Sequence, residues 1–314
     1  MAPGYVFPAF PLDSKVLPSI MAALAAFVAW PSWCACKLDL LILRMCAAFR
    51  LKTFGTSLFV LATVTVLAVL VTSCACMRCE RERRVLVYTK NQIGKGLYVH
   101  DNIPASVEAI KKLGAENNFA VDVSEDAAVF TDANLKRYTA LIFDNVNNEI
   151  FDKEEQKAAF QRYIRAGGGF VGIHSATGAM RTWDWYWSLI GGRFSRHAKM
   201  QTFTVKVKDP KDLSTAHLPA SFEWTDEFYY VDHIPPGLHV LLAGDLLKLD
   251  DPGKDKYPGK LFGDEFPLAW RHRFEGGRAW YTALGHQKEH YSDPMLTQHI
   301  LGGILWAMGE TKPK

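Results

Sequence analysis

Two kinds of hydrophobic pattern divide the chain near residue 83. Before it, long apolar stretches run with few polar interruptions; after it, short apolar runs alternate with stretches in which apolar residues recur every three or four positions. Short apolar runs indicate buried strands, and the longer period indicates helices with one apolar face. The pattern predicts a separate N-terminal region, residues 1–83, followed by a folded domain over residues 84–312.

The folded domain alternates strands and helices in its first half. The predicted strands are 85–88, 119–123, 140–143, 170–173, 202–207, 239–243, 267–270 and 279–284, and the predicted helices are 103–113, 152–165 and 294–308. This alternation is typical of βαβ units, which build an α/β fold with a mostly parallel sheet and helices on both faces. Residues 209–264 are rich in Pro, Gly, Asp and Lys, so we expect loops with short elements there, forming a lid or rim.

A sharp turn after one predicted strand is the most informative motif. Gly167–Gly169 leads into the apolar run Phe170–Ile173, which ends in the polar residues His174, Ser175 and Thr177. Such elbows usually present Ser or Cys as a nucleophile, but here the exposed position falls on a histidine. The neighbouring serine is not expected to be a nucleophile, because the second Gly of Gly-x-Ser-x-Gly is missing.

Polar residues follow other predicted strands as well. Asn91 and His100 come after the first strand, Asn145 after the third and His286 after the last. Ligands of open α/β sheets bind outside the carboxyl ends of the strands. We therefore expect these side chains to lie close to His174.

The N-terminal region contains two segments that are long enough to cross a membrane. Residues 16–36 carry no charge, and residues 53–77 contain the most apolar run of the chain. About twenty such residues span the ~30 Å of a bilayer core. A competing hypothesis starts the protein at Met45, with a cleaved signal peptide and Cys74 as the lipid-accepting residue of a bacterial lipoprotein box. Both predict membrane association, and we favour the extracytoplasmic face for the domain.

Charge and composition exclude several classes of function. The net charge of +3 is too small to favour a nucleic-acid partner. All six cysteines lie before residue 80, so the domain lacks the thiolate that a glutamine amidotransferase needs. No Gly-x-Gly-x-x-Gly follows the first strand, which argues against bound NAD. Residues 286–290 spell His-x-x-Glu-His, but this metalloprotease pattern needs a helix and here lies in a predicted loop.

The domain resembles a known family over about residues 84–310. The motifs that carry the resemblance are Tyr98–Ile103, Gly169–Thr177, Gly191–His197, Asp226–Tyr229, Pro267–Trp270, Gly277–His286 and Gln298–Ala307. Together they are similar to the ThuA-like, or trehalose-utilisation, family. The resemblance implies a flavodoxin-like fold of the class I glutamine amidotransferase type and a role in disaccharide or glycoside metabolism, often beside oxidoreductases that make keto-sugars. Family members often have Asp where this chain has Gly178.

The resemblance and the strand-end positions together give a set of candidate site residues. We expect His174 and Glu227 to be catalytic, and His197 and His286 to be ligands of a divalent metal. The expected substrate-binding residues are Asn91, His100, Ser175, Thr177, Tyr229 and Trp270. His174 has three open roles: a general base beside a sugar carbonyl, a metal ligand, or a histidine that only bonds the turn backbone.

Two hypotheses for function follow. The first is a membrane-anchored lyase, hydrolase or isomerase that acts on a disaccharide or keto-glycoside, with an oxidoreductase as a partner that supplies keto-sugars. The alternative is a non-catalytic module that binds or senses a sugar at the membrane.

Overall fold

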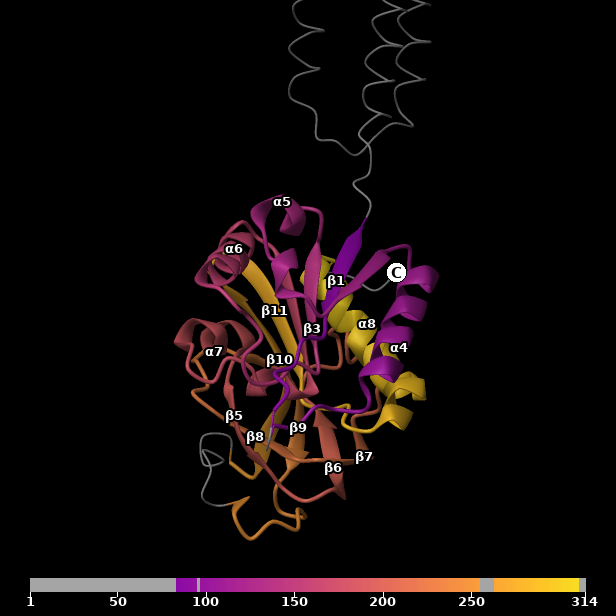
Figure 1. The fold of residues 1–314 in the computed structure, drawn as a ribbon. Helices are drawn as coiled ribbons and strands as arrows, with labels where there is room; N and C mark the ends of the chain where they lie inside the picture. The colour runs from indigo at the N-terminus through magenta and orange to yellow at the C-terminus, as the bar shows by residue number, and fades with distance from the viewer. Residues whose placement is uncertain (1–82, 95–96, 255–262, 311–314) are drawn as a thin grey trace, which may run out of the picture. The chain divides into compact units, whose positions relative to one another are not determined.

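The computed structural model describes residues 83–94, 97–254 and 263–310, and one large sheet forms the centre of this part of the chain (Figure 1). The strands are β1 (Arg84–Tyr88), β2 (Ala120–Ser124), β3 (Ala140–Asp144), β4 (Gly169–Ile173), β5 (Arg193–His197), β6 (Gln201–Val207), β7 (Ser221–Asp226), β8 (Tyr229–Asp232), β9 (His239–Asp245), β10 (Glu265–Phe274) and β11 (Gly277–Thr282). The helices are α4 (Ile103–Glu116), α5 (Asp132–Leu135), α6 (Glu154–Arg165), α7 (Asp184–Ile190) and α8 (Pro294–Met308).

The large sheet has a parallel half and an antiparallel half. Its order is β2-β1-β3-β4-β11-β10-β9-β6-β7, and the first five strands pair in parallel. These five follow the 2-1-3-4-5 strand order of flavodoxin-like sheets. The direction reverses at the β10–β11 hairpin, where Glu275 and Gly276 both have positive φ, as a two-residue type I′ turn requires. The α/β prediction is confirmed, while the parallel arrangement is confined to these five strands of a mixed sheet.

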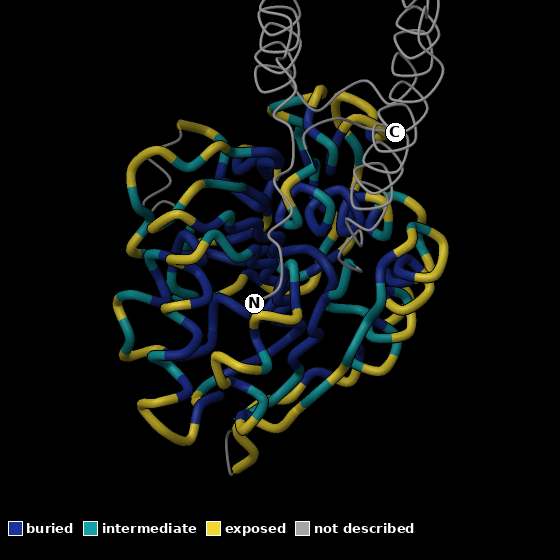
Figure 2. The backbone as a smooth tube through the Cα atoms, turned by 90° about the horizontal axis from the view of Figure 1, so that it is seen from above, coloured by how far each residue is buried: buried dark blue, intermediate teal, exposed yellow. Residues whose placement is uncertain are grey.

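Helices cover both faces of the parallel half (Figure 1). α4 and α8 pack on one face, and α6 and α7 on the other, so the central strands β1, β3, β4 and β11 are largely buried while the outer helix surfaces are exposed (Figure 2). Helix α8 approaches its neighbours closely through two glycines. A Cβ at Gly302 would lie 2.3 Å from the carbonyl oxygen of Leu213, and one at Gly303 would lie 2.3 Å from the indole of Trp280.

Besides β9, which was predicted, two strands lie inside residues 209–264, where we expected mainly loops. β7 alternates exposed Ser221, Glu223 and Thr225 with the more buried Phe222 and Trp224, a period of two that is typical of a half-buried strand. β8 is a short buried run that pairs only with β5, in a separate two-stranded ribbon. The joint between β7 and β8 carries Glu227.

The N-terminal predictions lie outside the described residues, which exclude both apolar segments, 16–36 and 53–77. Among the residues that the structure does describe, no helix combines the length and hydropathy needed to cross a bilayer.

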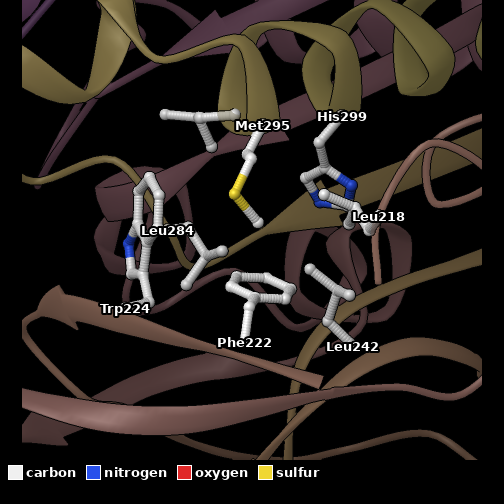
Figure 3. Close-up of a pocket in the computed structure, with 8 residues that line it drawn as sticks. Leu218, Phe222, Trp224, Leu242, Leu284, Met295 and His299 are labelled. Carbon is white, nitrogen blue, oxygen red and sulfur yellow. The ribbon is translucent and has the colours of Figure 1, made fainter. Parts of the chain in front are cut away.

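A small apolar cavity lies between α8 and the antiparallel half of the sheet (Figure 3). Phe222, Trp224, Leu242 and Met295 line it, and the ring of His299 borders it. Nδ1 of His299 donates to the carbonyl of Ser214 at 2.7 Å, while Nε2 has no hydrogen-bond partner within the described part of the chain. Burial therefore lowers the pKa of His299 to about 4.

This histidine is expected to make the domain lose stability in acid. Its pKa is lower in the folded chain than in the unfolded chain, so protonation favours unfolding as the pH falls from about 6.5 towards 4. The loss amounts to at most about 3 kcal/mol. In His299→Gln, the free energy of unfolding, measured with a denaturant at several pH values between 6.5 and 4, should fall less steeply with pH than in wild type. An equal dependence of the free energy of unfolding on pH in wild type and variant would contradict this account.

Candidate histidine centre

The predicted elbow is present, but the prediction that it exposes its histidine is wrong, because His174 is fully buried and its ring faces the interior of the domain. β4 ends at Ile173, and His174 follows in the left-handed region with a φ of 49°. Its Nδ1 lies 2.7 Å from the carbonyl oxygen of Ala283, just beyond β11. The hydroxyl of Tyr281 donates to the carbonyl of His174 itself at 2.8 Å. These bonds fix the ring, so that Nε2 faces the carboxyl edge of the parallel strands.

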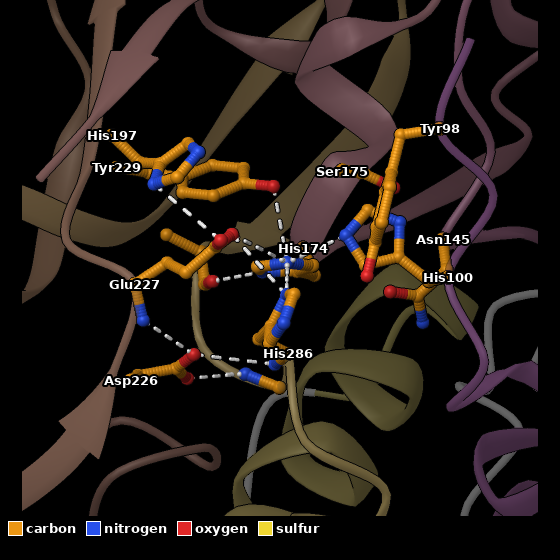
Figure 4. A network of polar contacts seen from close by, with 12 residues as sticks. Tyr98, His100, Asn145, His174, Ser175, His197, Asp226, Glu227, Tyr229 and His286 are labelled. Carbon is orange, nitrogen blue, oxygen red and sulfur yellow. Dashed lines mark hydrogen bonds and ion pairs between the residues drawn. The ribbon is translucent and has the colours of Figure 1, made fainter. Parts of the chain in front are cut away.

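Polar groups from separate parts of the chain converge on Nε2 of His174 (Figure 4). Nε2 of His100, from the loop before α4, lies 3.1 Å away, and Nδ1 of His286, after β11, lies 3.3 Å away. The hydroxyl of Tyr229, at the start of β8, lies 3.0 Å away. Glu227 completes the group, because its Oε2 lies 3.2 Å from Nδ1 of His286 and 3.8 Å from Nε2 of His174. We call these five residues the histidine centre.

The structure places the other predicted site residues around or away from this centre. His197 contacts the second carboxylate oxygen of Glu227, with Nδ1 3.4 Å from Oε1. The hydroxyl of Ser175 donates to the carbonyl of Val146, and Thr177 bonds the hydroxyl of Tyr281. Both side chains therefore support the elbow.

Asn91 and Trp270 also make contacts elsewhere. The amide of Asn91 donates to the carbonyls of Thr89 and Asn145. Trp270 is 1% exposed, and its indole N–H donates to the carbonyl of Ile190 at 2.8 Å. The contacts of Trp270 lie in the core, so its predicted substrate-binding role has no structural support.

Three residues near the centre were missed by the sequence analysis. Tyr98 is exposed, and its ring lies 4.7 Å from that of His100 and 6.3 Å from that of His286. Asp226 and Asn102 hold the loop that carries His286. Tyr98 and Asn102 flank His100 in the Tyr98–Ile103 motif, and Asp226 precedes Glu227, so proximity in sequence was the available signal.

The Gly285–His286 loop is held from both sides. The carboxylate of Asp226 accepts hydrogen bonds from the backbone N–H groups of Gly285 and His286, at 2.8 and 3.3 Å. The side-chain amide of Asn102 donates to the carbonyls of the same two residues, at 2.6 and 2.8 Å. Both side chains are fully buried. The position of His286 is therefore set by the protein before any ligand arrives.

The pKa values of the centre favour neutral histidines beside an ionised carboxylate. Burial lowers the pKa of His174 well below its usual value, and burial together with the nearby His286 lowers the pKa of His100 to about 4. The hydrogen bond with Glu227 raises the pKa of His286. Burial alone would raise the pKa of Glu227, but its hydrogen bond with His286 and the neighbouring histidines lower it overall. At neutral pH, His174 and His100 thus carry free lone pairs beside a negative charge.

This arrangement supports two kinds of chemistry. A neutral imidazole held in place can accept a proton from a substrate. His100, His174, His286 and Glu227 also offer one ligand atom each, all within 4.8 Å of one another, so they could hold a metal ion. The His-x-x-Glu-His pattern does not contribute as a helical motif, because His290 lies in the 3₁₀ turn Lys288–Ser292 with Nδ1 3.6 Å from Asp226.

The mixed sheet and the buried histidine centre define an α/β protein with a polar site at the carboxyl ends of its parallel strands. Residues 84–307 match the family model ThuA, described as trehalose utilisation. The chain therefore belongs to the ThuA family, and this membership indicates a carbohydrate-related function. Among curated proteins, no sequence is significantly similar to this chain.

Two solved structures support the fold. A putative ThuA-like protein from Bacteroides uniformis is 22% identical, with a TM-score of 0.54, and the match covers 72% of this chain and 91% of the other. A putative ThuA-like protein from Parabacteroides merdae is 18% identical, with a TM-score of 0.55, over 74% of this chain and 93% of the other. At this identity the similarity concerns the fold alone.

Proposed function

We propose that the protein is an enzyme that acts on a disaccharide or keto-glycoside at the histidine centre. The observation that carries this proposal is the fixed Nε2 of His174. It is a buried proton acceptor to which His100, Tyr229 and His286 all point, in a chain of the trehalose-utilisation family. A neutral histidine beside an ionised carboxylate is suited to removing a proton next to a sugar carbonyl, the step that lyases and isomerases of keto-sugars require.

The test is turnover of sugars by the purified chain. Trehalose, 3-keto-trehalose and related keto-glycosides are incubated with the protein, and the products are separated and identified by mass spectrometry. Ser175→Ala serves as a matched control, because its hydroxyl points to the carbonyl of Val146. We expect the control to keep wild-type turnover. Sugar binding by calorimetry with no product from any substrate would instead favour the binding or sensing module.

A second prediction concerns how the sugar is held. The exposed ring of Tyr98 lies beside His100 and His286, where an apolar sugar face can stack on it. Tyr98→Ala should raise the KM roughly fivefold, about 1 kcal/mol of lost contact, with a smaller effect on kcat. Tyr98→Phe keeps the ring and should stay near wild type. Steady-state kinetics of the three proteins checks this, and an unchanged KM in Tyr98→Ala would remove the ring from substrate binding.

We further propose that residues 1–83 attach the domain to a membrane, on its extracytoplasmic face. The support is the pair of apolar segments at 16–36 and 53–77. The full chain should sediment with membranes and be released by detergent, whereas a chain from residue 83 should be soluble. Mass analysis of the N-terminus separates the two hypotheses, because lipid on Cys74 requires cleavage and an intact Met1 excludes it. A full chain in the soluble fraction would contradict both.

The proposed substrate also implies a partner. A keto-sugar has to be formed by oxidation of a sugar hydroxyl, so we propose that an oxidoreductase supplies it. The sequence has no Gly-x-Gly-x-x-Gly after β1, which is why we assign the oxidation to a separate protein.

A further inference from the structure

We propose that His100, His174, His286 and Glu227 bind one divalent transition-metal ion. The inference concerns the site of the proposed function but does not depend on its substrate. It makes His174 a ligand and not the base, because an Nε2 lone pair that binds an ion cannot also accept a proton. The second carboxylate oxygen of Glu227, which lies near His197, would then be the proton acceptor. The starting point of the inference is the spacing of the four ligand atoms. Nitrogen ligands of Zn²⁺ lie about 2.0–2.1 Å from the ion, so two ligands at tetrahedral angles lie about 3.3–3.4 Å apart.

The spacing at the histidine centre is close to that value. Nε2 of His174 lies 3.1 Å from Nε2 of His100 and 3.3 Å from Nδ1 of His286. Oε2 of Glu227 lies 3.2 Å from the same nitrogen of His286 and 3.8 Å from Nε2 of His174. The four atoms come from four separate segments, and all lie within 4.8 Å of one another.

Hydrogen bonding alone does not account for this convergence. Nδ1 of His174 donates to the carbonyl of Ala283, so in the neutral ring Nε2 offers a single lone pair. The side chains of His100, Tyr229 and His286 all approach that lone pair, and only one of them can donate to it well. A cation at the centre accepts lone pairs from all three imidazoles. It also leaves the hydroxyl of Tyr229 free to donate to a group bound at the ion.

His100 is buried, and one of its ring nitrogens is unpaired among the residues that the structure describes. The residue is 5% exposed, and its Nδ1 has no hydrogen-bond partner within the described part of the chain. Buried polar side chains are normally paired, so the burial of this ring is unexplained by the protein contacts around it. An ion at Nε2 would leave Nδ1 as an unpaired N–H, so this atom does not itself point to the ion. The support for His100 as a ligand is the position of its Nε2, 3.1 Å from Nε2 of His174.

The surrounding contacts hold the ligands as metal sites require. Metal-ligating histidines usually donate their other N–H to a carbonyl or carboxylate, which fixes the tautomer and the ring orientation. His174 does so through Ala283. The backbone of His286 is held by Asp226 and Asn102.

The donor set selects the class of ion. Imidazole nitrogens suit Zn²⁺, Fe²⁺, Ni²⁺ or Cu²⁺, whereas Mg²⁺ and Ca²⁺ prefer sites made of oxygen atoms. One carboxylate leaves a net positive charge on a divalent ion. The ion would therefore attract and polarise a carbonyl or hydroxyl oxygen of a sugar.

Metal binding by the purified full chain tests the proposal without any sugar. The protein is stripped with a chelator, its cysteines are alkylated, and Zn²⁺ and Co²⁺ are titrated by calorimetry and visible absorption. Alkylation matters because all six cysteines lie before residue 80 and thiolates bind both ions. We expect one tightly bound ion per chain, with cobalt absorption bands but no thiolate charge-transfer band. Mg²⁺ should bind far more weakly.

Variants locate the ion. His286→Gln and Glu227→Gln change side chains that are 18% and 15% exposed, so they should fold, and circular dichroism verifies this. Each should weaken metal binding by more than the roughly 10–100-fold that the loss of an outer hydrogen-bond partner costs. The control His239→Gln removes a surface histidine paired with Asp209 at 2.8 Å and should bind as wild type does. Unchanged affinity in both centre variants, or no stoichiometric ion in wild type, overturns the proposal.

The result of the metal-binding test can be distinguished from the result of the turnover test. A bound ion without turnover of any sugar would keep the metal site and reject the substrate class. Turnover by protein that binds no ion would keep the enzyme and reject the metal site.

Discussion

Replacing His174 with asparagine is expected to reduce sugar turnover by about 10²–10⁴-fold, the usual contribution of a positioned acid–base group. Asparagine is the matched substitution because it tolerates the left-handed conformation that His174 adopts at a φ of 49°. Its side-chain amide can also replace the donor to the carbonyl of Ala283. The change thus removes Nε2 while keeping the elbow. Steady-state kinetics on the substrate turned over by wild type measures the effect.

Which of the two kinetic constants changes, kcat or KM, distinguishes the roles of His174. A fall in kcat with little change in KM indicates an interaction made in the transition state. Ser175→Ala, one residue along the same elbow, controls for disturbance of the turn. Wild-type kcat in a folded His174→Asn variant would leave His174 as a histidine that only bonds the turn backbone.

Replacing Gly302 with alanine is expected to destabilise the domain by about 2 kcal/mol or more, against the trend for helices. Alanine normally stabilises a helix interior by up to about 1 kcal/mol relative to glycine. Here the new Cβ would lie 2.3 Å from the carbonyl oxygen of Leu213 and 2.3 Å from the Cα of Ser214. Both are backbone atoms that cannot move aside, so α8 would have to shift away from this segment. Denaturant unfolding of wild type and variant measures the difference.

A surface substitution on the same helix is the control. Gln298 is exposed on α8, and Gln298→Ala adds no contact, so it should leave the free energy of unfolding within about 0.5 kcal/mol of wild type. If Gly302→Ala proved as stable as this control, the close approach of α8 would not be a constraint on the fold.

The parallel half of the fold was predictable because its central strands are short, buried runs between amphipathic helices. β3 and β4 are buried at every position, and α6 has a polar outer face. The antiparallel half was harder. β8 lies among turn-forming residues, and what stabilises it is its pairing with β5, a segment far away in the sequence. The local hydrophobic pattern does not reveal such a pairing. The Glu275–Gly276 hairpin that reverses the sheet was present in the sequence but not interpreted.

The sequence predicted where the candidate site lies better than it predicted which residues form it. Topology placed His100, His174 and His286 at one edge, and they do meet there. Trp270 illustrates the limit. It lies within a motif of the family, but the direction of its side chain depends on the β10 register, which carries a bulge at this point. Asp226 acts through the backbone of another segment, a contact that no spacing rule reveals.

The histidine centre draws its groups from two structurally distinct parts of the chain. Its three histidines belong to the parallel half, at the ends of β1, β4 and β11, whereas Glu227 and Tyr229 belong to the stretch 193–274 inserted between β4 and β11. That stretch also brings His197 beside the carboxylate. The acid and the histidines are therefore supplied by different halves of the fold, so any shift of the stretch 193–274 against the parallel half would change the 3.2 Å contact between Glu227 and His286.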